Sequence, residues 1–280
     1  MPNLENTELS DAANYSIEIA RERLAGKKLF VLTGAGLSTD SGIPDYRGAG
    51  RTPKHPMTYD IFMGSIESRQ RYWARSYVGW SRIAQAKPNA GHFALASAES
   101  QGNISSLVTQ NVDGLHNQAG SKNVIDLHGR LDRVICLGCK KVMARTAMDE
   151  LLKEYNPAIN RDSTVEFTPD GDAEVEGTES FVVPACPSCN GILKPDVVFF
   201  GEAVPPSRVE LSLNKLAEAD VLLVAGSSLT VNSGYRFARQ AAKAQKPIVI
   251  VNIGPTRADS LASAKIEANT SLALERLLID

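Results

Sequence analysis

Long hydrophobic runs are missing from this sequence of 280 residues. No eighteen consecutive residues are apolar, so no segment is expected to span a membrane. A large excess of charge of one sign is also missing. With a formal net charge of −2, the chain lacks the basic surplus that binding to nucleic acid or to an anionic membrane surface requires. Neither is therefore expected among its partners.

The N-terminal segment lacks the features of a targeting signal. It has no apolar signal core, and Glu5, Glu8 and Asp11 precede the first basic residue, Arg21. A mitochondrial presequence would be basic and poor in acidic residues. The sequence therefore predicts a cytoplasmic protein, or one from which a leader has already been removed.

Cysteine is scarce, and its arrangement is informative. The four cysteines form two pairs, Cys136-x-x-Cys139 and Cys186-x-x-Cys189, whereas a secreted domain of this size would scatter more of them. Two such pairs predict a tetrahedral four-thiolate zinc site. Four protein ligands leave no open position, so the predicted role is structural. A redox dithiol or an iron–sulfur cluster is the alternative, but no cofactor partner for either is visible in the sequence.

Short apolar runs alternate with helical patterns along most of the chain. Strands are expected at 28–33, 104–109, 221–225 and 248–252, and helical patterns follow Ser10 and cover 209–217 and 233–246. This alternation predicts an α/β fold in which a parallel sheet carries helices on both faces.

The stretch from Arg133 to Lys194 breaks this alternation, and it carries both cysteine pairs. The sequence therefore predicts a large discontinuous domain of residues 1–132 and 195–280, and a small zinc module of residues 133–194. Within the module, residues 149–179 hold ten acidic and two basic side chains. A solvated loop held at both ends by the metal is the expected structure. A role in selecting basic partners or in covering an active site is the alternative.

Ligands of such sheets bind beyond the carboxyl ends of the strands, where Thr33, Thr109, Gly226 and Asn252 are expected. Glycines after the first strand, at Gly34 and Gly36, would let the backbone approach a pyrophosphate; a tight turn without a ligand is the alternative. The dehydrogenase fingerprint requires a third glycine where this chain has Thr39, which disfavours hydride transfer.

Polar residues follow the second strand directly. Gln110, Asn111 and Asp113 are costly at a strand end unless they are solvated or bind something. His128, beside Gly129, is a candidate general base because the pKa of histidine lies near neutrality. The other histidines, His55, His92 and His116, are interpreted as structural. Asp45 and Arg47 either pair with each other or address polar groups of a cofactor.

Several of these motifs occur together in the order found in one family. They are Gly34-Ala-Gly with Gly42-Ile-Pro-Asp-Tyr-Arg47, Gln110-Asn-Val-Asp113, Leu115-His116, His128-Gly129, the two cysteine pairs, Lys194-Pro-Asp-Val-Val-Phe-Phe-Gly-Glu202, Gly226-Ser-Ser228 and Val251-Asn252. From about Ala25 to the C-terminus the chain resembles the sirtuins. Gln70-Arg-Tyr-Trp-Ala-Arg75, Val78-Gly-Trp80 and Asn252-Ile-Gly-Pro-Thr-Arg257 resemble the class II subgroup, which includes a human mitochondrial sirtuin. The missing presequence favours a bacterial, cytoplasmic member; a eukaryotic one would belong in the mitochondrial matrix.

The resemblance implies a Rossmann-like NAD-binding domain and assigns roles to single residues. His128 would be the general base, with Asn111 and Asp113 as further catalytic residues. The resemblance implies that Val197, Val198 and Phe199 form an edge that pairs with the substrate backbone, although plain sheet core explains each of them equally well. The implied contacts of NAD are Gly34, Ala35, Gly36, Ser38, Ile43, Pro44, Asp45, Tyr46, Arg47, Gln110, Asn111, Val112, Asp113, Gly226, Ser227, Ser228, Asn252, Ile253, Gly254 and Thr270.

The activity that the resemblance implies is NAD-dependent deacylation of protein lysines, with acylated lysines as substrate and nicotinamide, free lysine and O-acyl-ADP-ribose as products. ADP-ribosyl transfer at the same site is the alternative. An NAD-binding sensor without activity would not need His128. Acetyl is the expected acyl group, and longer or branched chains are credible. Tyr72 and Arg75 have the Tyr-x-x-Arg spacing of enzymes that remove acidic acyl groups, but an ordinary helix surface also explains it. A monomer is expected.

Overall fold

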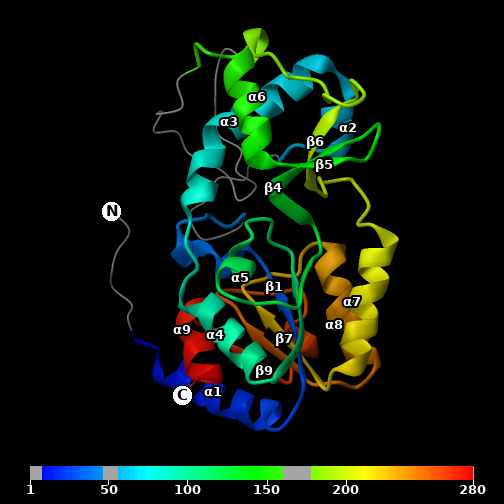
Figure 1. Ribbon diagram of the computed structural model, residues 1–280. Coiled ribbons are helices and arrows are strands. Elements are labelled where there is room, and N and C mark those ends of the chain that lie inside the picture. Colours follow the sequence, from blue (N-terminus) through cyan, green and yellow to red (C-terminus); the bar gives the residue numbers. More distant parts are fainter. Residues whose placement is uncertain (1–7, 47–55, 160–177, 280) are drawn as a thin grey trace.

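The computed structural model describes residues 8–46, 56–159 and 178–279. They form two lobes that meet at a narrow waist (Figure 1). Arg47, His55 and residues 160–177 of the acidic stretch lie outside the described residues. The larger lobe contains both ends of the described chain, and the smaller lobe carries the four cysteines.

The larger lobe is built on a parallel sheet, as the sequence predicts. Among the described residues, six strands lie in the order β3-β2-β1-β7-β8-β9. Their bounds are β1 (Leu29–Thr33), β2 (Ile104–Thr109), β3 (Val124–Asp126), β7 (Val221–Ala225), β8 (Ile248–Val251) and β9 (Ala264–Ile266). The four predicted strands are confirmed to within one residue at each end. Strands β3 and β9 were not predicted, because three residues are too few to establish a periodic pattern.

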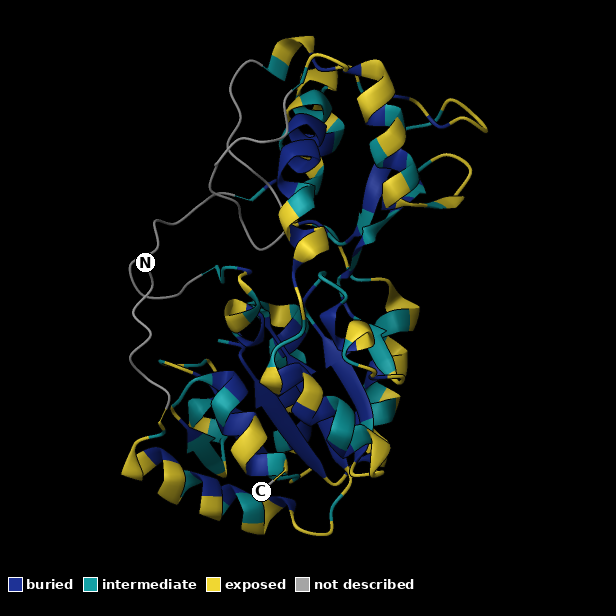
Figure 2. Ribbon diagram, turned by 60° about the vertical axis from the view of Figure 1, so that its left-hand side comes forward, coloured by how far each residue is buried: buried dark blue, intermediate teal, exposed yellow. Residues whose placement is uncertain are grey.

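Alternate residues of the central strands face opposite layers of helices, as the two-residue period of a strand requires. Val31, Leu223 and Val249 pack in one cluster with α1 (Asp11–Leu24), α4 (Ala90–Ser100) and α9 (Thr270–Leu278). Phe30 and Leu222 pack in another cluster with α7 (Pro206–Glu218) and α8 (Asn232–Lys243). Both faces are therefore covered, and the strands run through the buried centre of the lobe (Figure 2).

Local signals explain where helix α1 begins and ends. The Ser10 hydroxyl accepts a hydrogen bond from the Ala13 N–H (3.2 Å), and Asp11 lies in the first turn. Gly26 follows the helix in the left-handed region (φ 67°), which glycine adopts at little cost. The start at Ser10 and the end at Gly26 were both predicted from the sequence.

The smaller lobe contains an antiparallel sheet in the order β5-β4-β6, formed by β4 (Gly129–Cys136), β5 (Val142–Ala144) and β6 (Leu193–Val197). Helices α2 (Tyr59–Gly64), α3 (Ile66–Gln85) and α6 (Arg145–Tyr155) surround it (Figure 1). The remaining short helices of the described chain are α5 (Leu115–Gln118) and the 3₁₀ turns Ala35–Leu37, Thr39–Ser41, Thr178–Ser180 and Asp259–Leu261.

Helix α3 shares a hydrophobic cluster with the cysteine module. Trp73 is fully buried there, and its indole N–H donates to the Leu193 carbonyl (3.2 Å). Phe62 of α2 belongs to the same cluster. The division of the chain into 1–132 with 195–280 and 133–194 stays a prediction, and this packing favours placing α2 and α3 with the module.

No helix in the described parts of the chain combines the length and the apolar character that a membrane crossing requires.

Candidate active site and metal centre

The site lies where the order of strands reverses. Strands β2 and β3 follow β1 in one direction across the sheet, and β7, β8 and β9 extend it in the other, so the chain leaves β1 and β7 toward strands on opposite sides of the sheet. Open α/β sheets bind ligands at this switch point. The candidate residues after β1, β2, β7 and β8 all lie at this carboxyl edge.

The glycine loops after β1 and β7 cross in direct contact. The Gly34 and Gly36 N–H groups donate to the carbonyls of Ala225 (3.0 Å) and Gly226 (2.9 Å). A Cβ on Gly226, which has φ 64°, would lie 2.3 Å from the Leu37 nitrogen. A side chain there would therefore push the loops apart. In this structure the glycines allow the two loops to pack closely against each other. Their contact with a pyrophosphate stays a prediction.

A polar triad, of which Ser38 and Asn111 are buried and Asp113 is half-buried, joins the loops after β1 and β2. The Ser38 hydroxyl donates to Asp113 Oδ2 (2.7 Å) and accepts from the Asn111 amide (3.0 Å). The same amide donates to the Gly34 carbonyl (3.1 Å), and Asp113 Oδ1 accepts from the Leu115 N–H (2.9 Å). Burial raises the pKa of Asp113, and its hydrogen bonds to Leu115 and Ser38 oppose that rise. The three predicted side chains are thus brought together and held.

Gln110 is fixed at both its side chain and its backbone. Its Oε1 accepts from the Ser227 hydroxyl (2.7 Å), and its N–H donates to the Thr33 carbonyl (2.9 Å). Its side chain also packs against Gly234, where a Cβ would lie 2.6 Å from the Gln110 Nε2. The loop after β2 is therefore tied to the loop after β7 and to the start of α8.

His128 lies between β3 and β4 with a hydrogen bond at each ring nitrogen. Nδ1 lies 3.0 Å from the Gln110 carbonyl oxygen, and Nε2 lies 2.9 Å from the Ser233 hydroxyl. Burial lowers the pKa of His128 to about 4; the Gln110 carbonyl acts in the opposite direction, and Arg208 and Arg236 lower it further. The imidazole is therefore neutral at physiological pH, which is the form that a general base requires.

His92 and His116 form a buried pair behind the triad, with ring centroids 4.9 Å apart. His116 Nε2 lies 2.8 Å from the Thr33 hydroxyl, and His92 Nδ1 lies 3.3 Å from the Asn89 N–H in the cap of α4. Burial lowers the pKa of both, to about 4 for His92 and well below the usual value for His116. These contacts agree with the structural role expected for both histidines.

The loop after β1 continues toward the smaller lobe. The Ile43 side chain is buried in the hydrophobic cluster of that lobe, and its N–H donates to the Ser38 carbonyl (3.2 Å). The Tyr46 ring packs edge-on against Phe200 (5.9 Å between centroids). The predicted residues Ala35, Pro44 and Asp45 lie on the same loop. This segment therefore bridges the two lobes beside the site.

The predicted residues after β7 and β8 form the other side of the site. Asn252 Nδ2 donates to the carbonyls of Ile253 (2.7 Å) and Gly254 (3.3 Å), and Ile253 itself is exposed. The Ser228 and Thr230 hydroxyls lie 3.0 Å apart. Thr270 is buried at the start of α9, next to Asn269, whose amide donates to Asp40 (3.1 Å). Val112 packs against the cluster of the smaller lobe.

Strand β6 is an edge strand of the small sheet and leads into the predicted substrate segment. The side chains of Val197 and Phe199 are buried in the hydrophobic cluster, whereas Val198 between them is half-buried. The Val198 N–H donates to the His128 carbonyl (2.7 Å). The two buried side chains are core residues, so a contact with a peptide would fall to the backbone.

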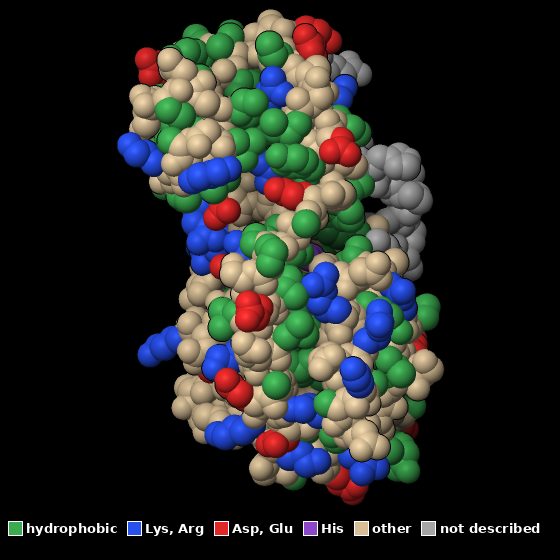
Figure 3. All heavy atoms as spheres, turned by 90° about the vertical axis from the view of Figure 1, so that its right-hand side faces the viewer, with side chains coloured by type: hydrophobic (Ala, Val, Ile, Leu, Met, Phe, Trp, Pro, Cys, Tyr) green, Lys and Arg blue, Asp and Glu red, His purple; other side chains and the backbone are tan. Residues whose placement is uncertain are grey.

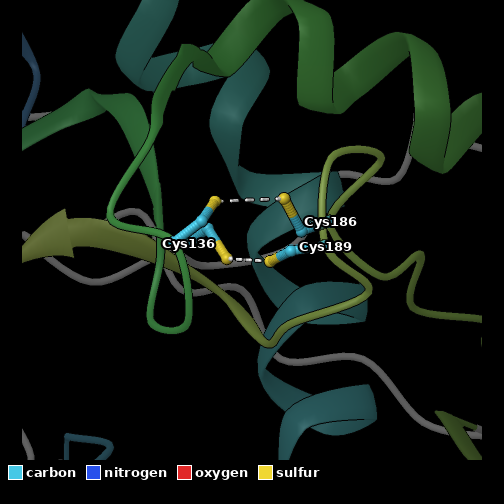
Figure 4. A group of neighbouring side chains, drawn as sticks. Cys136, Cys186 and Cys189 are labelled. Carbon is cyan, nitrogen blue, oxygen red and sulfur yellow. Dashed lines mark hydrogen bonds between the residues drawn. The ribbon is translucent and has the colours of Figure 1, made fainter.

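The four cysteines lie close together, and Figure 4 shows Cys136, Cys186 and Cys189 with their sulfur atoms turned toward one another. Their sulfur atoms all lie within 4.8 Å of one another, with 3.4 Å between Cys136 and Cys189 and 3.8 Å between Cys139 and Cys186. Tetrahedral zinc with Zn–S bonds of about 2.3 Å needs sulfur atoms roughly 3.8 Å apart, so the set fits the ion. Gly191 leaves the room: a Cβ there would lie 2.9 Å from the Cys136 sulfur. The set is closed, as a structural site requires.

The sequence reasoning assigned no role to two sets of residues at the site. Ser233 contacts His128 from 105 positions further along the chain, and no spacing rule connects them. The Lys194 ammonium and the Glu202 carboxylate pair beneath the β6 segment (2.9 Å). Ser233 gave no signal beyond its polar character at the start of a predicted helix, whereas Lys194 and Glu202 are the two ends of a motif that carries the resemblance.

Comparison with known proteins gives one consistent result. The model of the Sir2 family matches residues 34–233. An "NAD-dependent protein deacetylase" of Xanthomonas campestris pv. campestris (strain 8004) is 54% identical over 253 residues, which cover 89% of this chain and 86% of the relative. "NAD-dependent protein deacetylase 1" of Mycobacterium avium (strain 104) is 52% identical, over 91% of this chain and 92% of the relative. A solved structure described as "Sir2-p53 peptide-NAD+" has a TM-score of 0.74 at 31% identity, over 91% of this chain and 94% of that one.

Proposed function

The chain belongs to the Sir2 family, and on that premise we propose that it is an NAD-dependent protein lysine deacylase. The observation that carries the proposal is the neutral His128 imidazole at the switch point of the sheet, next to the residues that fix the ends of β1 and β2. An NAD-binding protein without activity would have no need of this base. NAD is consumed as a substrate in this reaction and is not a redox carrier.

The proposed chemistry begins with the acyl-lysine carbonyl oxygen, a weak nucleophile that is held against C1′ of the nicotinamide ribose. Nicotinamide leaves as that bond forms, and alignment of the two bound substrates supplies much of the rate. His128 then takes a proton from a ribose hydroxyl, whose oxygen attacks the former carbonyl carbon. A water molecule then adds to that carbon, and the bond from the carbon to the lysine nitrogen breaks, with the amine taking up a proton. The products are nicotinamide, free lysine and O-acyl-ADP-ribose.

We assign the two halves of NAD to the two sides of the site. The Ser38, Asn111 and Asp113 triad is suited to the nicotinamide ribose, because its buried polar atoms are preorganised beside His128. Ser227, Ser228 and Asn252, after β7 and β8, are assigned to the adenosine half. The polar donors and acceptors that gather at this edge support the assignment, and the separate contacts stay predictions.

The acylated substrate is assigned to the waist between the lobes. Among the described residues, β6 pairs within its sheet on one side only, with β4, and Phe200 beyond it bridges to Thr58. The other side of β6 supports recognition of an extended peptide by backbone hydrogen bonds with little sequence preference. Figure 3 shows this waist as a constriction between the lobes, with Lys and Arg side chains gathered along one of its margins. A bacterial cytoplasmic location and a monomeric state remain our predictions. The relatives above are bacterial, which supports a bacterial source for the chain.

A panel of acyl-lysine peptides incubated with NAD tests the proposal. We expect nicotinamide release that depends on the peptide, with acetyl-lysine accepted, and we expect His128→Ala to lower the rate of deacylated-peptide formation at least roughly a hundredfold, the usual contribution of a general base. Melting temperature serves as the control for folding of the variant. The mass of the product separates deacylation from ADP-ribosyl transfer: an O-acyl-ADP-ribose supports the first, and a modified acceptor the second. Formation of deacylated peptide at the full rate by the variant would contradict the role of His128.

A further inference from the structure

The two hydrogen bonds of His128 define the protonation of its ring. The Gln110 carbonyl oxygen can only accept, so Nδ1, 3.0 Å away, must carry a hydrogen. In the neutral imidazole Nε2 is then an acceptor, and its partner 2.9 Å away is the Ser233 hydroxyl, which donates to it. Nε2 is therefore the nitrogen that can receive a proton, and Ser233 lies directly at it.

Ser233 lies in the first turn of helix α8, and the contacts of that turn hold it beside His128. Ser233 is the second residue of the helix, and Gly234 after it packs so closely on Gln110 that any Cβ would clash with the amide. On the outer side Arg257 donates to Asn232 Oδ1 (2.7 Å) and to the Thr230 carbonyl (3.3 Å). The first turn of α8 is therefore clamped between Gln110 and Arg257, which leaves the Ser233 hydroxyl little freedom.

The proton transfer leaves a new N–H group on Nε2, and Ser233 can accept a hydrogen bond from it. When a ribose hydroxyl gives its proton to Nε2, the electron pair of the broken O–H bond stays on the ribose oxygen, and the ring becomes an imidazolium with two N–H groups. The Gln110 carbonyl accepts from one of them. A hydroxyl can accept as well as donate, so Ser233 can rotate its hydrogen away and accept from Nε2–H. A buried cationic N–H without a partner would be far less stable.

We propose that Ser233 is a positioning residue of the general base: it orients the His128 ring in the free enzyme and accepts a hydrogen bond from Nε2–H once the ring has become charged. This inference rests on the proposed deacylase function. It places the contribution of Ser233 after the departure of nicotinamide, because the base acts only then. Loss of the hydroxyl should therefore slow the second half of the reaction and spare the first.

Ser233→Ala and Ser233→Thr form the test pair, with Ser105→Ala as the control. Ser105 also donates one hydrogen bond, to the Leu29 carbonyl (3.0 Å), but at the opposite end of the sheet. Two rates are measured with an acetyl-lysine peptide: formation of deacylated peptide, and exchange of labelled nicotinamide into NAD, which reports only the first step. For Ser233→Ala we expect deacylation to fall roughly tenfold or more, as for a lost hydrogen bond to a charged group, and exchange to change less than about twofold. Ser233→Thr should keep most of the deacylation rate.

Two results overturn the inference: deacylation that Ser233→Ala leaves unchanged, or deacylation and exchange that fall together, since a general structural defect would slow both. An activity-independent measurement separates this failure from that of the proposed function. In protein with ¹⁵N-labelled histidine, the Nε2 shift of His128 in the free enzyme should show a hydrogen-bonded acceptor, and it should move toward the unbonded value in Ser233→Ala but not in Ser105→Ala. If wild-type protein deacylates no peptide, the proposed function fails and this shift still decides whether Ser233 holds the ring.

Discussion

A single imidazole at this site combines burial with two hydrogen bonds, and the two effects have different consequences. Burial disfavours the charged ring and lowers the pKa of His128 to about 4. The Gln110 carbonyl and the Ser233 hydroxyl instead fix where the ring points and which nitrogen is free of hydrogen. His128 is therefore always ready as a base at neutral pH, although the proton it takes is held less tightly than by an exposed histidine.

The pH dependence of activity follows from that lowered pKa. The neutral ring is the active form, so activity is present above the folded-state pKa and is lost as the pH falls through it. We expect kcat/KM for deacylation to show no loss from His128 protonation between pH 7.5 and pH 5.5, and a decline only as the pH approaches about 4. An exposed histidine would already be half protonated near pH 6.5.

The measurement is the initial rate of deacylated peptide formation at low peptide concentration across that range, because kcat/KM reports the free enzyme. Melting temperature at each pH controls for unfolding. An acid limb centred between pH 6 and 7 in a protein that remains folded would show that the site does not desolvate His128 as the structure requires.

At the scale of loops and strands, the crossing of the segments after β1 and β7 sets the geometry of the site. Gly226 and Gly26 offer a matched comparison, because both have φ near 65°. An added Cβ would meet the Leu37 nitrogen at 2.3 Å in the first case and nothing within 4 Å in the second. Gly26→Ala should lower the free energy of unfolding by about 1–2 kcal/mol, the cost of the left-handed backbone alone.

Gly226→Ala adds a clash between two backbones to the same cost. We expect it to lower the free energy of unfolding by about 3 kcal/mol or more, and to weaken NAD binding because the two loops must separate. Urea unfolding of both variants, with titration of NAD by calorimetry, measures the difference. Equal losses in the two variants would mean that the crossing loops adapt without strain.

An ion pair of Lys194 and Glu202 contacts the backbone at the end of β6 and just after it. Lys194 is 3% exposed, its ammonium pairs with Glu202 (2.9 Å), and it also contacts the Val197 carbonyl. Glu202 in turn accepts from the Phe199 N–H (3.0 Å), and the Lys194 ammonium lies 4.6 Å from the centre of the Phe199 ring. Burial lowers the pKa of Lys194, while Glu202 opposes that shift. The pair thus fixes the backbone that is proposed to receive the peptide.

Lys194→Met keeps much of the side-chain volume but removes the charge from this pair. Because Glu202 then lacks its cation, we expect a loss of about 2–4 kcal/mol in the free energy of unfolding. We also expect a several-fold rise in the KM of the peptide with a smaller change in kcat, because the substitution displaces the β6 segment that is proposed to bind the peptide and leaves His128 in place. Lys215→Met, which breaks the exposed pair of Lys215 with Glu218 (2.8 Å), is the control and should alter neither. An unchanged peptide KM for Lys194→Met would separate this segment from substrate binding.

At the scale of the whole molecule, the smaller lobe depends on its four cysteines. Cys136 and Cys186 are buried in the same cluster as Trp73 and Phe199, so the predicted metal centre and the proposed peptide edge share one core. Thiolates that are brought within 4.8 Å of one another repel unless a cation lies between them. Loss of the metal should therefore disturb the substrate side of the site, although the proposed chemistry uses no cysteine.

Removal of the metal tests this dependence. We expect one zinc per chain by elemental analysis. A chelator should lower the melting temperature and the deacylation rate together, and added zinc should restore both as far as unfolding is reversible. Cys139→Ser should reproduce the effect without chelator. Metal-free protein with full activity and an unchanged melting temperature would exclude a structural role for the four cysteines.

The sequence by itself determined the elements whose residues interact mainly with their neighbours in the chain. The buried strands at 29–33, 104–109, 221–225 and 248–251 are visible as short apolar runs, and Ser10 and Gly26 mark the ends of the first helix because capping is a local interaction. The two cysteine pairs likewise predict metal binding from the sequence alone, since each pair already has the spacing of two metal ligands.

Tertiary structure alone decided which distant residues meet. It packed α3 onto the cysteine module, directed the Val197 and Phe199 side chains into the core, and set Gly226 against Leu37. It also brought Ser233 to the imidazole of His128 across 105 positions of the chain. No local pattern carries this information, because each of these contacts depends on the relative placement of elements that only the folded sheet and its connections define.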